Sequence, residues 1–66
     1  MQITVNGDQQ VIGAASSLQD LLESLQMTNG RIAVELNGEI VPKSSFQRHV
    51  LRDGDKIEIV QAIGGG

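Results

Sequence analysis

The sequence predicts an α+β domain in which a mixed sheet of four to five strands packs one face against a single main helix. Two observations predict this class. Several short segments alternate apolar and polar residues, which is the period of a half-buried strand. One segment between the second and third of these carries apolar residues at helical spacing. A chain of 66 residues allows one domain of this kind.

The first two strands are expected to form a hairpin. Residues 1–5 alternate apolar and polar side chains, so one face should be buried. Asn6-Gly7 follows, and both residues tolerate the positive φ angles of a tight two-residue turn. The return strand is expected over about residues 9–14. It contains Val11 and Ile12 side by side, and the pattern leaves open which of them faces the core.

The helix is expected to begin after Ser17. This serine can cap free N–H groups of the first turn, and Asp20 three residues later completes a capping box. Asn29-Gly30 is expected to end the helix, with Gly30 in the left-handed C′ position. Leucines recur between these ends at i, i+3, i+4 and i+7 and form one apolar stripe, Leu18, Leu21, Leu22 and Leu25.

A third strand and a short fourth strand follow the helix. Residues 32–36 alternate in strand period and end at Asn37-Gly38, a second turn of the hairpin type. Ile40-Val41 is a short extended piece, which Pro42 confines to an edge or an end. The polar stretch after it is expected to be a loop or short helical turn, with Phe46 as its anchor in the core.

The last strand is expected over residues 56–62. It follows Asp53-Gly54-Asp55, whose residues favour a tight turn. Strand period places Ile57 and Ile59 in the core and directs Val60 and Ala62 to the opposite, outward face.

Composition excludes several classes of function. The chain has no Cys, so it has no disulfide and no thiolate metal site. Its formal net charge of −3 argues against binding the phosphate backbone of nucleic acid, and the single aromatic residue argues against base stacking. No apolar run approaches the ~20 residues that span a bilayer. We therefore expect a cytoplasmic protein that binds neither nucleic acid nor membrane.

No catalytic or metal site is indicated. A calcium loop starting at Asp53 would need a glutamate at its twelfth position, which is Gly64. His49 has no nucleophile or orienting acid at a recognisable spacing. The glutamates at 35, 39 and 58 are expected on solvated faces, and no two carboxylates have a catalytic spacing.

The glycines at the end of the chain are different. Gly64-Gly65-Gly66 comes directly off the last strand, and no helix follows that would make it a phosphate-binding loop. Without Cβ atoms such an arm can pass through a narrow slot. Residues 63–66 can reach about 13 Å and carry the Gly66 carboxylate into another protein's active site. We therefore divide the chain into a domain over residues 1–63 and a tail over 64–66.

The whole chain resembles the ThiS family, the sulfur carriers of thiamine (thiazole) biosynthesis within the ubiquitin-like β-grasp fold. The third glycine, Gly64, occupies a position that varies in the family. The resemblance rests on the segments Met1–Gly7, Ser17–Leu25, Ala33–Lys43 with Phe46, Asp53–Ile63 and the final Gly65-Gly66.

The resemblance implies a protein co-substrate rather than an enzyme. In the family, a ThiF-like adenylyltransferase uses ATP to convert the final glycine, here Gly66, to an acyl-adenylate. Sulfur from a cysteine desulfurase relay then displaces AMP and leaves a thiocarboxylate. Thiazole synthase (ThiG) takes up that sulfur. The carrier itself is expected to hold no cofactor.

Three alternatives remain open. The small subunit of molybdopterin synthase shares the tail chemistry, although it is usually longer. A ubiquitin-like modifier joined to lysines also needs a free Gly-Gly carboxylate. A non-covalent β-grasp interaction module would carry an inert tail.

Docking of the partner enzymes is expected beside the tail. Val60 and Ala62 should be exposed there, and Ile63 follows where the strand gives way to the tail. Contiguous exposed apolar surface often marks a partner site, so we expect Val60, Ala62 and Ile63 to bind the partners.

Overall fold

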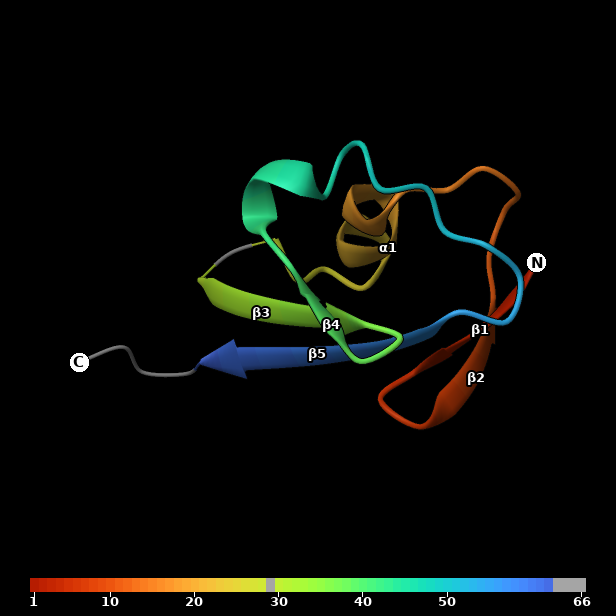
Figure 1. The fold of residues 1–66 in the computed structure, drawn as a ribbon, viewed down its shortest axis with the longest axis horizontal. Coiled ribbons are helices and arrows are strands. Elements are labelled where there is room, and N and C mark those ends of the chain that lie inside the picture. The colour runs from red at the N-terminus through yellow and green to blue at the C-terminus, as the bar shows by residue number, and fades with distance from the viewer. Residues whose placement is uncertain (29, 63–66) are drawn as a thin grey trace.

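A computed structural model describes residues 1–28 and 30–62, apart from the side chain of Ala62. The described residues form one sheet, one α-helix and one short 3-10 helix (Figure 1). The elements in chain order are β1 (Gln2–Val5), β2 (Asp8–Val11), α1 (Leu18–Ser24), β3 (Arg31–Leu36), β4 (Glu39–Val41), η1 (Lys43–Ser45) and β5 (Lys56–Ala62).

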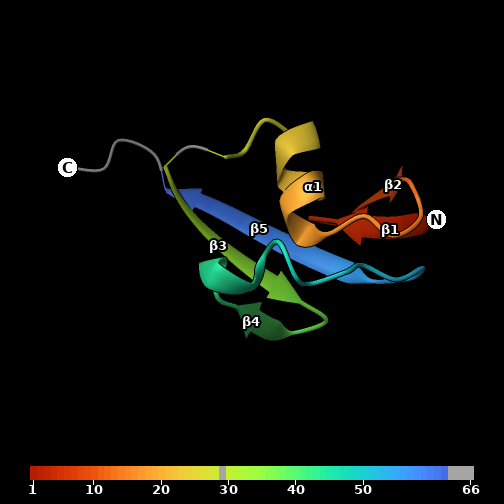
Figure 2. The same ribbon diagram turned by 90° about the horizontal axis from the view of Figure 1, so that it is seen from above.

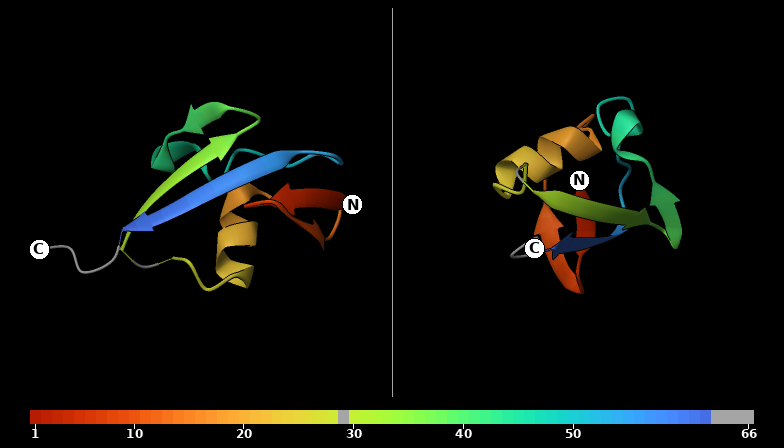
Figure 3. Two further views of the ribbon diagram at one scale, coloured as in Figure 1. Left: turned by 90° about the horizontal axis from the view of Figure 1, so that it is seen from below. Right: turned by 90° about the vertical axis from the view of Figure 1, so that its left-hand side faces the viewer.

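The sheet has the strand order β2-β1-β5-β3-β4. The first and last strands, β1 and β5, lie side by side and parallel, whereas the other neighbouring pairs are antiparallel. Helix α1 crosses one face of this sheet between β2 and β3 (Figure 2). The views in Figure 3 show that no helix of the described residues covers the opposite face. The predicted α+β class and mixed sheet of four to five strands are thus confirmed, and the sheet has five strands.

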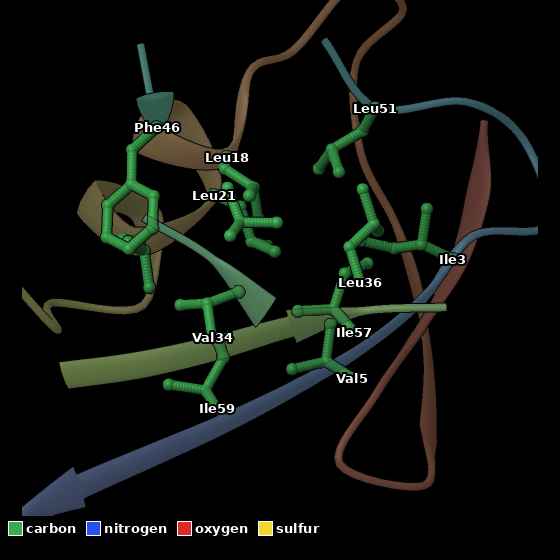
Figure 4. Packing of buried hydrophobic residues seen from close by; sticks show 12 residues of the cluster. Ile3, Val5, Leu18, Leu21, Val34, Leu36, Phe46, Leu51, Ile57 and Ile59 are labelled. Carbon is green, nitrogen blue, oxygen red and sulfur yellow. The ribbon is translucent and has the colours of Figure 1, made fainter. Parts of the chain in front are cut away.

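The core lies between α1 and the helix-facing side of the sheet, which we call the inner face (Figure 4). Helix α1 contributes three leucines of its apolar stripe, and Leu25 is partly buried against them. Phe46, directly after η1, is also buried, as predicted. The sheet contributes Ile3, Val5, Val34, Leu36, Val41, Ile57 and Ile59. Alternation along each strand explains this set, because every second side chain of a strand points to the same face.

Both predicted hairpin turns are confirmed. Asn6 and Gly7 have φ angles of 49° and 87°, and Asn37 and Gly38 have φ angles of 51° and 87°. Two successive residues with positive φ make a type I′ turn, whose twist matches that of the flanking strands. Each turn therefore sets the register of its strand pair.

The structure decides which of Val11 and Ile12 faces the core. Val11 is 80% exposed, whereas Ile12 packs against the core. Strand β2 ends at Val11, so the predicted extent of this strand, residues 9–14, is wrong at both ends. Ile12 still exchanges two backbone hydrogen bonds with Met1 just beyond the paired strands.

The helix begins as predicted and ends earlier than predicted. The Ser17 hydroxyl accepts from the Asp20 N–H, and the Asp20 carboxylate accepts from the Ser17 N–H, which is a capping box. At the other end, Gln26 has a φ of 59° and Met27 donates its N–H to the Leu22 carbonyl. This is a Schellman motif with glutamine at C′.

The expected stop at Asn29-Gly30 is therefore wrong. Gly30 does have a positive φ, but it lies in the loop before β3, and Asn29 lies outside the described residues. The helix ends early because Met27 turns back to pack on the core. An apolar residue at C″ in contact with the last helical turn is the usual companion of a Schellman motif.

Candidate functional site

Strand β5 leads the chain to the predicted tail and is held on both sides. Its neighbour β3 pairs with it over six positions, from Leu36 opposite Ile57 to Arg31 opposite Ala62. On its other side, β1 pairs with it at two positions. Ile57 and Ile59 are buried against the core. The strand that leads to the predicted tail is therefore the central strand of the sheet and is hydrogen-bonded on both sides.

Asn6 extends the contact between the first hairpin and β5 beyond the end of β1. Its backbone N–H donates to the Ile57 carbonyl at 2.9 Å. Its side-chain amide then bonds to both backbone groups of Ile59: Oδ1 accepts from the N–H at 2.7 Å, and Nδ2 donates to the carbonyl at 3.2 Å. The Asn6 side chain thus takes the place of a further strand residue.

Asn37, in the second hairpin turn, holds the start of β5 in a similar way. Its backbone N–H donates to the Lys56 carbonyl, and its Oδ1 accepts from the Lys56 N–H at 2.9 Å. Its Nδ2 donates to Asp55 Oδ1 at 3.0 Å. Both type I′ turns therefore serve a second purpose, because each places an asparagine side chain against β5.

The turn before β5 is tied to the beginning of the chain. Asp53 accepts the Gln2 N–H through Oδ1 at 2.7 Å, and Gly54 donates its N–H to the Gln2 carbonyl. Gly54 has a φ of 88°, a conformation that suits glycine. The acidic turn predicted from Asp53-Gly54-Asp55 is thus a structural connection.

The side of the sheet away from α1, here called the outer face, carries Val60 beside the end of β5. Val60 is 66% exposed and lies opposite Ala33 of β3, which is also exposed. Strand β5 thus alternates as predicted, with Ile59 inside and Val60 outside.

The other predicted site residues lie at the edge of what the structure describes. The backbone of Ala62 is the last residue of β5, and its side chain lies outside the described residues. Ile63, Gly64, Gly65 and Gly66 also lie outside them. The partner-binding and tail roles of these residues, and the boundary between domain and tail, stay predictions.

The sequence reasoning placed Glu35 and Glu58 on solvated faces, but it did not predict that they are neighbours or that Ile40 is exposed beside them. Ile40 of β4 is 78% exposed and lies opposite Glu35 of β3, which in turn lies opposite Glu58 of β5. The three side chains thus form one row across the sheet. The outward direction of Glu35 and Ile40 was readable from alternation, but their adjacency to Glu58 depends on the pairing of strands distant in the chain.

Two open hollows lie away from the end of β5. They measure about 440 and 560 Å³, and both are lined by Leu36, Asn37 and His49 near the second hairpin turn. Among the described residues, no group of three or more potential metal-ligating side chains comes together. No helix in the described ranges is long and apolar enough to cross a membrane.

Comparisons with known proteins agree with this arrangement. A family model described as the ThiS family matches residues 2–66. The sulfur carrier protein ThiS of Escherichia coli K12 is 35% identical over 66 residues, which cover all of both chains. The crystal structure of a thiamine biosynthesis protein (ThiS) from Geobacter metallireducens superposes with a TM-score of 0.84 at 32% identity, again over all of both chains.

A second kind of relative is much longer. A thiazole synthase of Paramagnetospirillum magneticum is 44% identical over 66 residues. The match covers this whole chain but a fifth of that protein. A domain of this kind therefore also occurs within longer proteins.

Proposed function

The chain belongs to the ThiS family and is a sulfur carrier protein of thiamine biosynthesis, and on this premise we propose that Gly66 is the residue that carries the sulfur. A carrier of this kind is acted on by enzymes rather than being one. The observation that carries the proposal is the match with a sulfur carrier over the full length of both chains, with three glycines that begin two residues after the end of the central strand β5.

Activation of the carboxylate is the first step of the proposed cycle. A carboxylate resists nucleophilic attack because it is anionic and its oxygen is a poor leaving group. A ThiF-like adenylyltransferase joins the Gly66 carboxylate to the AMP part of ATP and releases pyrophosphate. ATP is thus a substrate of the partner, and the carrier holds no cofactor. We expect this step in the cytoplasm, where ATP is available.

Sulfur transfer is the second step. A cysteine desulfurase relay supplies the sulfur as a protein persulfide, and a thiol reductant brings it to the oxidation level of sulfide while being oxidised to a disulfide. The sulfur attacks the acyl carbon of Gly66, the new C–S bond forms, and AMP leaves. The product is a thiocarboxylate, which thiazole synthase consumes. The part that this domain plays is positioning. Hydrogen bonds from Asn6 and Asn37 hold β5 in place, so the tail starts from a defined position.

Thiazole synthase is the proposed acceptor. Two proteins named thiazole synthase each contain a segment similar to this whole chain, at 44% and 36% identity. Fusion of two domains in one chain favours their contact, because it raises the effective concentration of each for the other. We propose that Val60, Ala62 and Ile63 form the contact beside the tail. Of these, the exposed Val60 side chain lies within the described residues.

Intact mass spectrometry tests the proposed modification. The carrier is incubated with ATP, the adenylyltransferase and a sulfide donor, and each component is left out in turn. We expect a mass gain equal to the replacement of one oxygen by one sulfur, located by fragmentation at Gly66 and dependent on ATP. An unchanged mass in the complete mixture would contradict the proposal and favour a non-covalent interaction module.

A further inference from the structure

Two carboxylates lie directly opposite each other on the outer face of the sheet. Glu35 of β3 is paired in register with Glu58 of β5. The Cβ atoms of directly opposite residues are about 4.5–5.5 Å apart, and like charges in such a pair destabilise a sheet. The free protein therefore keeps an unfavourable pair at the middle of this face.

The surrounding charges compensate this pair incompletely. Lys56 Nζ lies 3.9 Å from Glu58 Oε1, but both side chains are more than half exposed, so this ion pair contributes little. No ion pair of Glu35 is found within residues 1–28 and 30–62. The basic residue of β3 itself is Arg31, which precedes Glu35 by four residues and so lies about 13 Å from it along the strand.

Apolar side chains border the two carboxylates. Ile40 lies next to Glu35 in the same row, and Val60 and Ala33 form the next row toward the end of β5. Ile40 and Val60 are 78% and 66% exposed. We call these five residues, Ala33, Glu35, Ile40, Glu58 and Val60, the outer patch.

We propose that the outer patch docks thiazole synthase through one basic side chain, arginine or lysine, that the enzyme presents within apolar surroundings. This inference rests on the proposed function, because it names the chemistry by which the acceptor recognises the carrier. An arginine guanidinium has five donors in a planar fork and can bridge two adjacent carboxylates. The apolar residues around it match the aliphatic part of such a side chain.

Three observations select this occupant. Charge complementarity requires a basic group against Glu35 and Glu58. The patch is continuous with Val60, the described residue of the contact already proposed beside the tail. Proteins named thiazole synthase contain a segment similar to this whole chain. Docking would relieve in the complex a repulsion that exists in the free carrier, and this difference favours binding.

The variant Glu35→Gln tests the inference because it moves stability and binding in opposite directions. It removes one of the two facing charges and leaves the Lys56–Glu58 pair in place. We expect the Tm of the free carrier to rise by about 1–4 °C as the repulsion is lost. We expect the Kd for thiazole synthase from the same organism to increase about 10-fold or more.

Glu39→Gln is the matched control. Glu39 is exposed on the neighbouring strand but lies opposite Leu36, whose side chain faces the core, so it is not on the outer face. This variant changes the net charge by the same amount and should leave the Kd within about twofold. Glu58→Gln should repeat the loss seen with Glu35→Gln, which guards against an effect of one variant on folding.

An unchanged or smaller Kd in Glu35→Gln and Glu58→Gln would overturn the inference, whichever way the Tm moves. An equal loss in Glu39→Gln would also overturn it, since net charge alone would then decide affinity. The adenylyltransferase is titrated in parallel, and a loss of affinity for this enzyme alone would also overturn the inference. The mass assay separates this inference from the proposed function, because Gly66 can gain sulfur normally even if the outer patch proves irrelevant.

Discussion

Single residues decide how closely the chain follows ideal local geometry. Within residues 1–28 and 30–62, four residues other than glycine have positive φ angles: Asn6, Ala15, Gln26 and Asn37. The two asparagines suit this region because their short side chains find local hydrogen bonds. Gln26 at the helix C′ position has no such advantage, since glycine is the residue that occupies this position without strain. The end of α1 is therefore a point of stored strain.

Replacing Gln26 with glycine should stabilise the protein. Glycine removes the strain of the left-handed conformation, which stabilises the folded state by about 1–2 kcal/mol. It also makes the unfolded chain more flexible, which lowers the stability by about 0.4–1 kcal/mol. We expect the free energy of unfolding in urea to increase by about 0.5–1 kcal/mol. Glu23→Gly, inside the helix, is the control and should lower it by about 1 kcal/mol. A loss of stability in Gln26→Gly would show that the glutamine side chain contributes contacts that outweigh the strain.

At the scale of elements, β5 is fixed by the two hairpin turns as well as by its neighbouring strands. Asn6 is the clearer case because its amide bonds to both backbone groups of one residue, Ile59. Ile59 lies seven residues before Gly66 in the sequence. The same side chain that favours the turn therefore also helps to hold β5 in place before the proposed tail.

Removing the Asn6 side chain should weaken the fold. Asn6→Gly keeps the positive φ and removes two hydrogen bonds, each contributing about 0.5–1.5 kcal/mol. We expect the free energy of unfolding to fall by about 1–3 kcal/mol, measured in urea. Asn6→Asp retains the acceptor for the Ile59 N–H and loses the donor, so its free energy of unfolding should lie between those of Asn6→Gly and the unmodified protein. Equal stability of all three proteins would mean that the hydrogen bonds between the Asn6 side chain and Ile59 do not stabilise the fold.

The two faces of β5 should separate stability from binding. Ile59→Ala removes core contacts and should cost about 2–5 kcal/mol. Val60→Arg places a charge on the outer face, so it should weaken binding of both the adenylyltransferase and thiazole synthase and barely change the Tm. Titrations against each enzyme and thermal melts of both variants measure this. Unchanged affinity of Val60→Arg for both enzymes would place recognition elsewhere.

At the scale of the whole molecule, stability and reactivity occupy different parts of the chain. The buried hydrophobic residues in the described ranges all lie between Ile3 and Ile59. The proposed reacting group, the Gly66 carboxylate, follows the last strand. Under the proposed function, the folded part of the chain is the surface that partner enzymes recognise, and the proposed tail is the part that enters their active sites.

Adding one residue after Gly66 should abolish activation without unfolding the protein. The extension moves the carboxylate away from the glycine that the adenylyltransferase must accept. We expect no ATP-dependent mass gain and a Tm within about 1 °C of the unmodified chain, since the core is untouched. Deletion of Gly66 should behave in the same way. Normal adenylation of the extended chain would refute the assignment of Gly66.

Much of the fold was predictable because its signals are local. Alternation in strand period identified the strands, Asn6-Gly7 and Asn37-Gly38 identified the turns, and Ser17 with Asp20 identified the start of the helix. The end of the helix was not predictable in this way. Gln26 adopts an unfavourable conformation so that Met27 can pack on the core, and that gain arises from tertiary contacts.

The sequence by itself determined the α+β class, the family and the glycine-rich end, because local patterns give the first and last, and the family follows from motifs along the chain that can be read without knowing how they lie in space. Only the tertiary structure decided that Ile12 rather than Val11 joins the core and that Glu35 faces Glu58 beside Ile40. Strand period says which side chains share a face. It does not say which strands are neighbours, because that order follows from how distant segments bury one common core.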